Sequence, residues 1–425
     1  MLTRLRLSRR RIIRTLAGFG AIALVVCLIV PHAWAWYHLR AAIAASARYH
    51  PEEARKALLT CQAVWQGSST VHLLISRAAR QEGDLETADR ELRICQRLSG
   101  GATNETAFEW ALLQASAGNV REVDEYLQKQ VNHSPEAGPL VWEALAEGYL
   151  RIYRAPDAMA CLSLWLKQHP DDIRALELRG RTYVTGKGIS RGSDDYRRVL
   201  VLDPSRQQTR WRLIECLIDL GTYDEAAEQL ELYAREHPDN PEVVSRLARC
   251  YNVLNRREEA RQLLDSMLAK FPDDGECLRI RGQIALTDPQ DPQVEKAEGW
   301  IRRAAAALPE DYQTQWLLFE TLRRQGKVAE ANEQHKKVEV VKDRMERLGE
   351  LRSRKLAMQP LDPALHYEMG ILMIQTGYPD TGEMWLHTAL GLDPDHKPTH
   401  AALADYYDRI GNKGRAEDHR RRAAH

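Results

Sequence analysis

Apolar and small residues recur along this chain at two spacings. Within short segments, bulky apolar residues stand three and four positions apart, as Trp142, Leu145 and Tyr149 do, which places them on one face of a helix. The longer spacing is marked by four prolines that stand 34 residues apart: Pro170, Pro204, Pro238 and Pro272. A fixed period of this length predicts an array of small helical units stacked on one another, because a single compact core would not repeat.

Each unit has two positions reserved for small residues. With the terminal proline as position 32, the units begin near residues 35, 69, 104, 139, 173, 207, 241, 275, 312, 363 and 397. Position 8 is small in most units: Ala146, Gly180, Ala248, Gly282, Gly370 and Ala404. Position 20 is small in nearly all: Ala54, Ala88, Ala158, Gly192, Ala226, Ala260, Ala297, Ala331, Gly382 and Ala416, with Val123 as the exception. Small residues let the axes of two crossing helices approach closely, so each unit is predicted to be a pair of packed helices.

Turn-forming residues separate these predicted helices. A glycine or asparagine stands near position 15 in many units: Gly83, Gly118, Gly221, Asn255, Gly326, Gly377 and Gly411. The proline at position 32 ends the second helix, because it lacks an N–H and clashes with the preceding turn. Aspartate often stands beside it, as Asp203 and Asp393 do, where it favours a turn and is expected to cap the next helix.

This pattern resembles the tetratricopeptide repeat, whose small positions 8 and 20 and terminal proline it matches. The resemblance covers about residue 35 to residue 425. It implies an all-α, right-handed superhelical solenoid of helix-turn-helix repeats, and we expect about ten to eleven of them over residues 38–425. An N-terminal span followed by repeats is also similar to membrane-anchored bacterial members of the family, although the C-x-x-C module that ends one such family is absent.

Two insertions interrupt the period. One adds three residues near 288–292 and predicts an enlarged turn, and the other adds about 17 residues before Pro360. The second predicts a longer helix near 328–357, with an apolar stripe at helical spacing made by Val338, Val341, Met345 and Leu348. This stripe either packs on neighbouring helices or projects as an arm that binds a partner.

The N-terminus carries a strongly one-sided charge. Residues 1–15 hold six arginines and no acidic residue, and an apolar run follows. We predict that residues 1–15 are a basic cytoplasmic segment and that residues 16–37 form one transmembrane helix, a signal anchor. These 22 residues are enough to cross the hydrocarbon of a bilayer, and Trp34, Trp36 and Tyr37 suit its interface.

Two other interpretations of the same segment stay open. An uninterrupted apolar run of 15 residues ending before Ala33-Trp34-Ala35 also suits a cleaved signal peptide. The segment from Ser8 to Arg14 resembles a twin-arginine export signal, with Ile12 where phenylalanine is usual. All three interpretations leave the basic segment inside. The predicted localisation is therefore the cytoplasmic membrane, single-pass, with the repeats in the periplasm or extracytoplasmic space.

The repeats occupy nearly all of the chain after residue 35, which leaves no room for a catalytic fold. The chain is therefore predicted to be no enzyme but a protein–protein interaction scaffold, anchored in the cytoplasmic membrane and assembling an envelope-associated complex. Two alternatives remain: a non-catalytic subunit of an envelope polysaccharide or secretion enzyme complex, and a secreted soluble repeat protein.

Other kinds of chemistry have little support in the sequence. No C-x-x-C or H-E-x-x-H motif is present, so neither a metal nor a cofactor is expected, and nor is a small-molecule substrate. After residue 14 the chain has 54 basic and 60 acidic residues, which argues against nucleic acid as a partner. Cysteines at equivalent positions of neighbouring units, such as Cys61 and Cys95, are expected about 10 Å apart, too far for a disulfide.

The family resemblance implies that the first helices line a groove, with positions 2, 5, 6, 9 and 12 pointing into it. In the central units these positions include Arg174, Arg181, Trp211, Arg212, Arg246, Arg249, Asn252, Arg279 and Trp316. Arginine pairs bidentately with carboxylates and tryptophan offers a large stacking surface, so these residues are candidates to bind an acidic or C-terminal segment of a partner. The alternative is a solvated face on which the arginines pair with interleaved residues such as Glu177, Glu215, Glu242 and Glu276.

Overall fold

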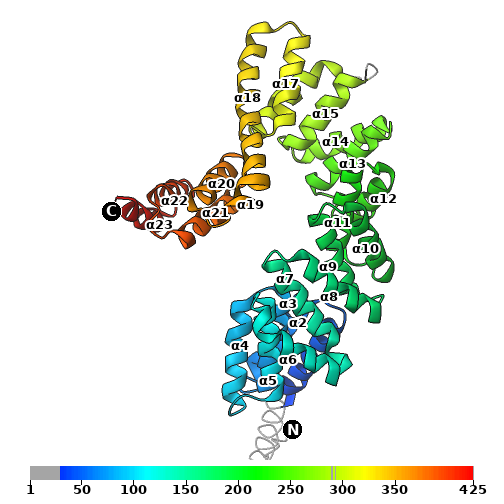
Figure 1. Cartoon of the computed structure of the whole chain (residues 1–425). Coiled ribbons are helices and arrows are strands. Elements are labelled where there is room, and N and C mark those ends of the chain that lie inside the picture. The colour runs from blue at the N-terminus through cyan, green and yellow to red at the C-terminus, as the bar shows by residue number, and fades with distance from the viewer. Residues whose placement is uncertain (1–28, 289–290, 292, 425) are drawn as a thin grey trace, which may run out of the picture. The chain divides into compact units, whose positions relative to one another are not determined.

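The computed structural model describes residues 29–288, 291 and 293–424, which form helices joined by short turns, with no strand among them (Figure 1). The chain divides into two compact units, Met1–Gly221 and Thr222–His425. Unit 1 contains a helical segment at 29–47, α2 (Pro51–Val64), α3 (Ser69–Glu82), α4 (Leu85–Leu98), α5 (Asn104–Ser116), α6 (Val120–His133), α7 (Gly138–Arg151), α8 (Ala155–Gln168), α9 (Ile173–Thr185), α10 (Ile189–Leu202) and α11 (Gln207–Leu220).

Unit 2 continues the same alternation. It contains α12 (Tyr223–Ala234), α13 (Pro241–Val253), α14 (Arg257–Lys270), α15 (Gly275–Thr287), α16 (Ala297–Ala307), α17 (Tyr312–Arg324), α18 (Val328–Glu350), α19 (Leu356–Met358), α20 (Pro363–Gln375), α21 (Pro379–Leu392), α22 (Lys397–Arg409) and α23 (Lys413–Ala424). A π-helical turn, Leu351–Lys355, joins α18 to α19, and 3-10 turns lie at Pro135–Ala137 and Val294–Lys296. The prediction of an all-α repeat protein is confirmed, and the right-handed superhelical course stays a prediction.

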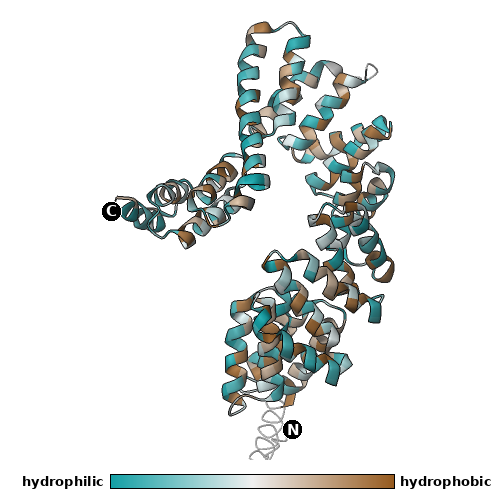
Figure 2. Ribbon diagram, viewed as in Figure 1, coloured by the Kyte–Doolittle hydropathy of each residue, from teal (hydrophilic) through white to brown (hydrophobic). Residues whose placement is uncertain are grey.

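Each helical pair packs on its neighbours in sequence. In unit 1, α3 contacts its partner α4 and also α5, the first helix of the next pair. In unit 2, α15 contacts α16 and α13 in the same way. Apolar residues gather where these helices meet and polar residues lie outside (Figure 2). Because each pair buries its apolar face against the next, the core within each unit runs from one helical pair to the next, as it does in repeat proteins.

The small residues at positions 8 and 20 lie where paired helices cross. The alanines at position 20 are all buried: Ala54, Ala88, Ala158, Ala226, Ala260, Ala297, Ala331 and Ala416. Where both positions are glycine, the crossing leaves no room for a β-carbon. A β-carbon added to Gly192 would lie 2.8 Å from the main-chain oxygen of Gly180, and one added to Gly382 would lie 2.7 Å from that of Gly370. Side-chain size at these two positions therefore sets the helix separation.

Position 15 of the repeat adopts a left-handed backbone conformation in every repeat where the structure describes that residue. The residues with positive φ there are Tyr49, Gly83, Gly118, Tyr153, Lys187, Gly221, Asn255, Gly326, Gly377 and Gly411. The glycines and the asparagine are the residues that the sequence pattern identified. Tyr49, Tyr153 and Lys187 take the same conformation without the usual residue type, at a cost of about 1–2 kcal/mol each.

Aspartates cap many of the helices, but not always those beside the prolines. Asp84, Asp172, Asp274, Asp311 and Asp362 each accept a hydrogen bond from a main-chain N–H in the first turn of the following helix. Asp203 and Asp393 instead accept from the main-chain N–H two residues on, which stabilises the turn after α10 and after α21. The expected cap from these two residues is therefore wrong, and their role is in the turn.

The enlarged turn near 288–292 is fastened to the helices by a buried arginine. The guanidinium of Arg281 is fully buried and donates to Asp291 in the turn at 2.7 and 3.2 Å and to Asp265 of α14 at 2.7 Å. It also lies 4.4 Å from the ring centre of Trp300. Two carboxylates and an aromatic face offset the cost of burying this charge.

The long helix α18 packs on neighbouring helices along most of its apolar stripe. Val338 and Val341 are buried, and Leu348 packs in a cluster with Leu351 and Leu365 of the following segments, while Met345 stays exposed. The rest of α18 is largely hydrophilic (Figure 2). This packing favours the first interpretation of the stripe over a projecting arm.

The helical segment at 29–47 pairs with α2. Ala35 is fully buried, and its carbonyl oxygen accepts from Cys61 Sγ at 3.1 Å. The indole N–H of Trp65 donates to Nδ1 of His32 at 2.7 Å. The first part of this segment is therefore part of the first helical pair.

The predicted single-pass membrane localisation is wrong. Within the described part of the chain, no helix is both long and apolar enough to cross a membrane. The last nine residues of the predicted span 16–37 belong to the helical segment that packs on α2. That segment also contains histidine and arginine side chains, so it is not uniformly apolar. The basic segment and the rest of that span lie outside the described residues.

The cysteines in the described residues are unpaired, and all but Cys161 are buried. Burial raises the pKa of the Cys216 and Cys250 thiols to about 11. These side chains therefore stay protonated near neutral pH and act as small apolar fillers between helices.

Candidate protein-binding surface

The nine candidate groove residues lie on first helices of the pairs, in both units. Arg174 and Arg181 lie on α9, and Trp211 and Arg212 lie on α11, all in unit 1. Unit 2 holds the other five, Arg246, Arg249 and Asn252 on α13, Arg279 on α15, and Trp316 on α17. The surroundings of the two sets differ, and we describe them separately.

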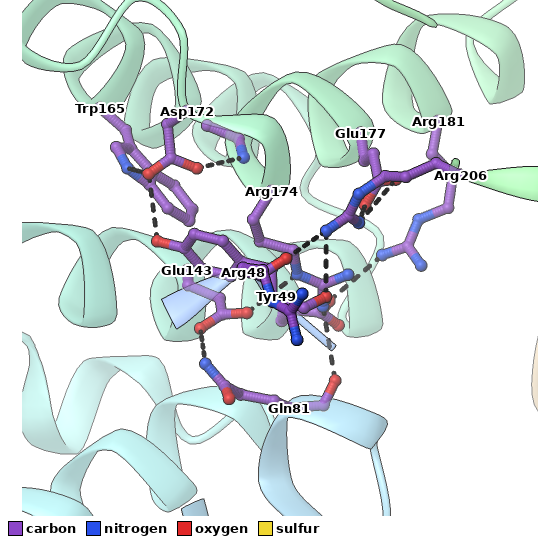
Figure 3. Close-up of polar contacts among 12 residues, drawn as sticks. Arg48, Tyr49, Gln81, Glu143, Trp165, Asp172, Arg174, Glu177, Arg181 and Arg206 are labelled. Carbon is purple, nitrogen blue, oxygen red and sulfur yellow. Dashed lines mark hydrogen bonds and ion pairs between the residues drawn. The ribbon is translucent and has the colours of Figure 1, made fainter. Parts of the chain in front are cut away.

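In unit 1 the inner face of the helices is crossed by a network of charged side chains (Figure 3). Arg174 donates to Glu143 and to Glu147 of α7, each at 2.9 Å. Arg181 reaches Glu147 at 3.4 Å, and Gln81 of α3 donates to Glu143 at 3.0 Å. The carboxylates of α7 thus already occupy the arginines that sequence analysis assigned to an acidic ligand.

The turn at the end of the first helical segment inserts into the same face. The Tyr49 hydroxyl donates to Asp172 at 3.1 Å, and the Arg206 guanidinium donates to the main-chain oxygens of Arg48 and Tyr49 (Figure 3). Arg206 also pairs with Glu177 at 3.1 Å. Residues from both ends of unit 1 therefore meet on this face and fill it.

Unit 1 also contains a buried carboxylate that pairs with two arginines. Glu109 of α5 is fully buried and accepts from Arg77 and Arg80 of α3, each at 2.9 Å. Burial by itself would raise the pKa of Glu109, but the two guanidinium groups outweigh it and hold the pKa below its ordinary value. Arginines of α3 and α9 thus pair with carboxylates of α5 and α7 in unit 1.

In unit 2 an open groove of about 510 Å³ lies between α15 and α17. Its lining combines apolar and aromatic side chains with polar ones: Arg279, Gln283, Leu286, Thr287, Tyr312, Gln313, Trp316, Leu317, Glu320, Thr321 and Arg324. Trp316 is 39% exposed, with its ring stacked on Tyr312 at 6.1 Å and tilted against Phe319 at 5.2 Å. Packing on both sides fixes this indole in place while leaving one part of it open to solvent.

Charged residues stand around this aromatic centre. Arg279 is buried and holds Glu276, its neighbour on α15, at 2.6 Å. Arg324 is exposed and lies 3.6 Å from Glu320, a carboxylate that also pairs with Arg323 at 3.0 Å. An exposed guanidinium that holds its carboxylate loosely is suited to exchange it for a carboxylate from a ligand.

The structure thus brings together two of the nine candidates, Arg279 and Trp316. Arg246, Arg249 and Asn252 on α13 do not line the groove, and Arg246 pairs with Glu242 on its own helix at 2.9 Å. In unit 1, Trp211 and Arg212 are partly buried on α11, where Arg212 lies beside the hydroxyl of Tyr196.

Sequence analysis missed several residues of the groove. Leu286, Leu317 and Glu320 occupy positions 12, 6 and 9, which the family uses for its groove, but only arginine, asparagine and tryptophan were selected. Tyr312 and Arg324 lie at positions 1 and 13 and carry no such signal. Among the described residues, no group of three or more histidine, cysteine or carboxylate side chains is arranged to hold a metal ion.

Comparison with known proteins finds tetratricopeptide repeats in part of the chain. The model of the tetratricopeptide repeat matches residues 178–241 and residues 217–284. Hsp70-Hsp90 organizing protein 3 of Arabidopsis thaliana is 26% identical over 171 residues, which are 39% of this chain and 30% of that protein. The chain therefore matches less than a third of the length of this relative.

Solved structures with similar folds are more distant. Human IFIT1, solved as a dimer with PPP-AAAA, is 17% identical over 84% of this chain and 90% of its own, with a TM-score of 0.31. MamA is 13% identical over 38% of this chain and 94% of its own, with a TM-score of 0.34. At these scores the likenesses carry no argument about function. Residues 178–284 therefore match the tetratricopeptide repeat, and the helices on either side of them form pairs of the same kind with small crossing residues.

Proposed function

We propose that this protein is a non-catalytic scaffold that binds a segment of a protein partner in the groove between α15 and α17. Repeats of this family are generally scaffolds that bind proteins, and the matched relative is named for organising two other proteins. The observation that carries the proposal is the position of Trp316, a clamped and partly exposed indole at the centre of an open groove.

The chemistry of the groove favours a segment that carries an apolar side chain and a carboxylate. Trp316, Leu286 and Leu317 offer an apolar floor, on which a side chain of a partner would exclude water. Arg324 stands at its rim and would pair with an acidic side chain or a C-terminal carboxylate. The inner face of unit 1 is not proposed as a binding site, because its arginines are already paired with carboxylates of the chain.

The test is site-specific photo-cross-linking in the native host. A cross-linking residue is placed at the exposed groove position Gln313 and, for comparison, at exposed Lys336 on α18. We expect a partner to be captured from Gln313 only, and the capture to fall about tenfold or more in Trp316→Ala, as for a binding hot spot.

The matched control is Trp110→Ala, which removes an indole of similar exposure, 44%, from α5 in unit 1. It should leave the capture unchanged. Circular dichroism of each variant separates loss of binding from loss of folding. The proposal fails if folded Trp316→Ala captures the same partners from Gln313 as the parent chain does.

A further inference from the structure

Helices α21, α22 and α23 bring three histidines together in unit 2. Nδ1 of His400 and Nδ1 of His419 lie 2.9 Å apart, and their ring centres are 5.1 Å apart. His419 also stacks on Tyr407 at 5.6 Å and lies 6.2 Å from His387. His400 is only 1% exposed, so this contact is part of the packing of α23 on α22.

The hydrogen bonds of the two rings indicate which ring nitrogens carry protons. Nε2 of His400 lies 2.9 Å from the main-chain oxygen of Pro394, which can only accept, so Nε2 carries the proton. Nδ1 of neutral His400 then carries a lone pair and no proton, so it accepts a hydrogen bond from Nδ1–H of His419. With both rings fully protonated, two N–H groups would face each other at 2.9 Å. The contact therefore holds only while at least one of the two facing Nδ1 atoms is unprotonated.

The surrounding charges do not favour an extra proton on His419. Burial, followed by His400, His387 and Arg422, lowers its pKa, and Asp418 opposes them. The other charged or titratable groups that face this cluster are Glu383 on α21, Tyr407 and Asp408 on α22, and Arg415 on α23. Glu383 is already shared among Tyr407, His387 and Arg415.

Few buried contacts hold α23 in place. The helix is largely hydrophilic (Figure 2), and Ala416 is its one buried residue among those described. Arg415 donates to the Tyr407 hydroxyl at 3.2 Å and pairs with Glu383, while the exposed ion pair between Arg420 and Asp408 adds little, as surface pairs generally do. The histidine contact is therefore one of a small number of contacts that dock α23 on the preceding helices.

We propose that this contact makes the docking of α23 dependent on pH: α23 stays docked while at least one of the facing Nδ1 atoms of His400 and His419 is unprotonated, and it detaches in mild acid, when both rings are protonated. Detachment would uncover Leu403 and Tyr407, which lie beneath α23 in the same apolar cluster as Ala416. This pH-dependent docking does not involve the groove between α15 and α17.

Proton linkage gives the direction and the size of the pH effect on the docking of α23. Separated histidines each take up a proton near pH 6.5, whereas the docked pair excludes the second proton. The detached state therefore binds more protons, and docking weakens as the pH falls below about 6.5. One proton bound only in the detached state shifts the docking equilibrium by up to about tenfold between pH 7.5 and pH 5.5.

Hydrogen–deuterium exchange of the whole chain, corrected for intrinsic rates, measures this shift directly. We expect the protection of amides in α23 to fall by up to about tenfold between pH 7.5 and pH 5.5, and that of α13 to stay constant. Equal protection of α23 at both pH values, or no protection at either, would overturn the proposal.

A variant separates the histidine contact from general acid effects. In His419→Asn the side-chain N–H stands close to the position of Nδ1 and still donates to His400, but it cannot charge. Its pH response should fall below about threefold, while His335→Asn, an exposed histidine of α18, should respond as the parent does. An unchanged response in His419→Asn would refute the mechanism. If that variant does not dock α23 at pH 7.5, histidine NMR titration of the parent decides, since protonation of both His400 and His419 must accompany the loss of α23 protection.

Discussion

The hydroxyl of Tyr49 donates a hydrogen bond of 3.1 Å to Asp172, a residue 123 positions further along the chain. The same carboxylate accepts from the indole of Trp165 and from the main-chain N–H of Ala175, also at 3.1 Å. One side chain thus joins the first turn of unit 1 to the start of α9. Stacking between neighbours is therefore not the only interaction that holds unit 1 together.

Removal of the Tyr49 hydroxyl should weaken this connection modestly. Tyr49→Phe is expected to lower the free energy of unfolding of unit 1 by about 1 kcal/mol, because Asp172 keeps two other donors. Urea denaturation measures the loss. Tyr153→Phe, which alters a tyrosine that is 96% exposed, should change nothing. Equal effects of the two variants would show that the hydrogen bond does not contribute.

Two glycines of α21 should respond to alanine with opposite signs. At Gly382 the new β-carbon would lie 2.5 Å from Ile374 Cγ1 and 2.7 Å from the Gly370 oxygen, so Gly382→Ala should destabilise unit 2 by about 1–3 kcal/mol. At Gly391 no atom lies within 4 Å, so Gly391→Ala should stabilise the helix by about 0.5–1 kcal/mol. Thermal unfolding compares the pair, and a shift in the same direction for both would contradict close helix crossing at Gly382.

Glycine should stabilise a turn that holds a tyrosine in a left-handed conformation. Tyr153 has a φ of 58° and its side chain is exposed, so Tyr153→Gly relieves backbone strain without loss of packing. Relief of about 1–2 kcal/mol, less the entropy that glycine gains in the unfolded chain, leaves a gain of about 0.5–1 kcal/mol. Chemical denaturation tests this value. Tyr153→Ala, which keeps the strain, should give no such gain.

The buried carboxylate of Glu109 should make unit 1 sensitive to acid. Its pKa in the folded chain is below the unfolded value of about 4.3, so the carboxylate contributes stability above that value. The contribution is lost as the pH falls below about 4.3 toward the lowered pKa. Thermal unfolding between pH 3 and pH 7 measures it.

Glu109→Gln is the matching variant. It should be destabilised at neutral pH by about 3–5 kcal/mol, because Arg80 is left buried without its carboxylate, and it should lose part of the acid sensitivity. A variant as stable as the parent at pH 7, with the same acid profile, would rule out this role for Glu109.

The repeat pattern predicted which residues pack between paired helices but not which charges are free to bind a ligand. Position 20 could be read from the sequence because a small residue at a fixed period has one main physical reason, close helix crossing. Arg174 and Trp316 were equivalent candidates by position and residue type. The structure separates them, since Arg174 lies between Glu143 and Glu147 whereas Trp316 stands open in a groove.

The sequence by itself determined the period, the pairing of helices and the small residues at their crossings, because these depend on helical periodicity and side-chain size over a few turns. Only the tertiary structure decided where charges are neutralised. Arg181 meets Glu147 from 34 residues away, and Arg206 meets the carbonyl oxygen of Arg48 from 158 residues away. Which charged residues pair depends on the distances between helices in space. The order of residues along the chain does not give those distances.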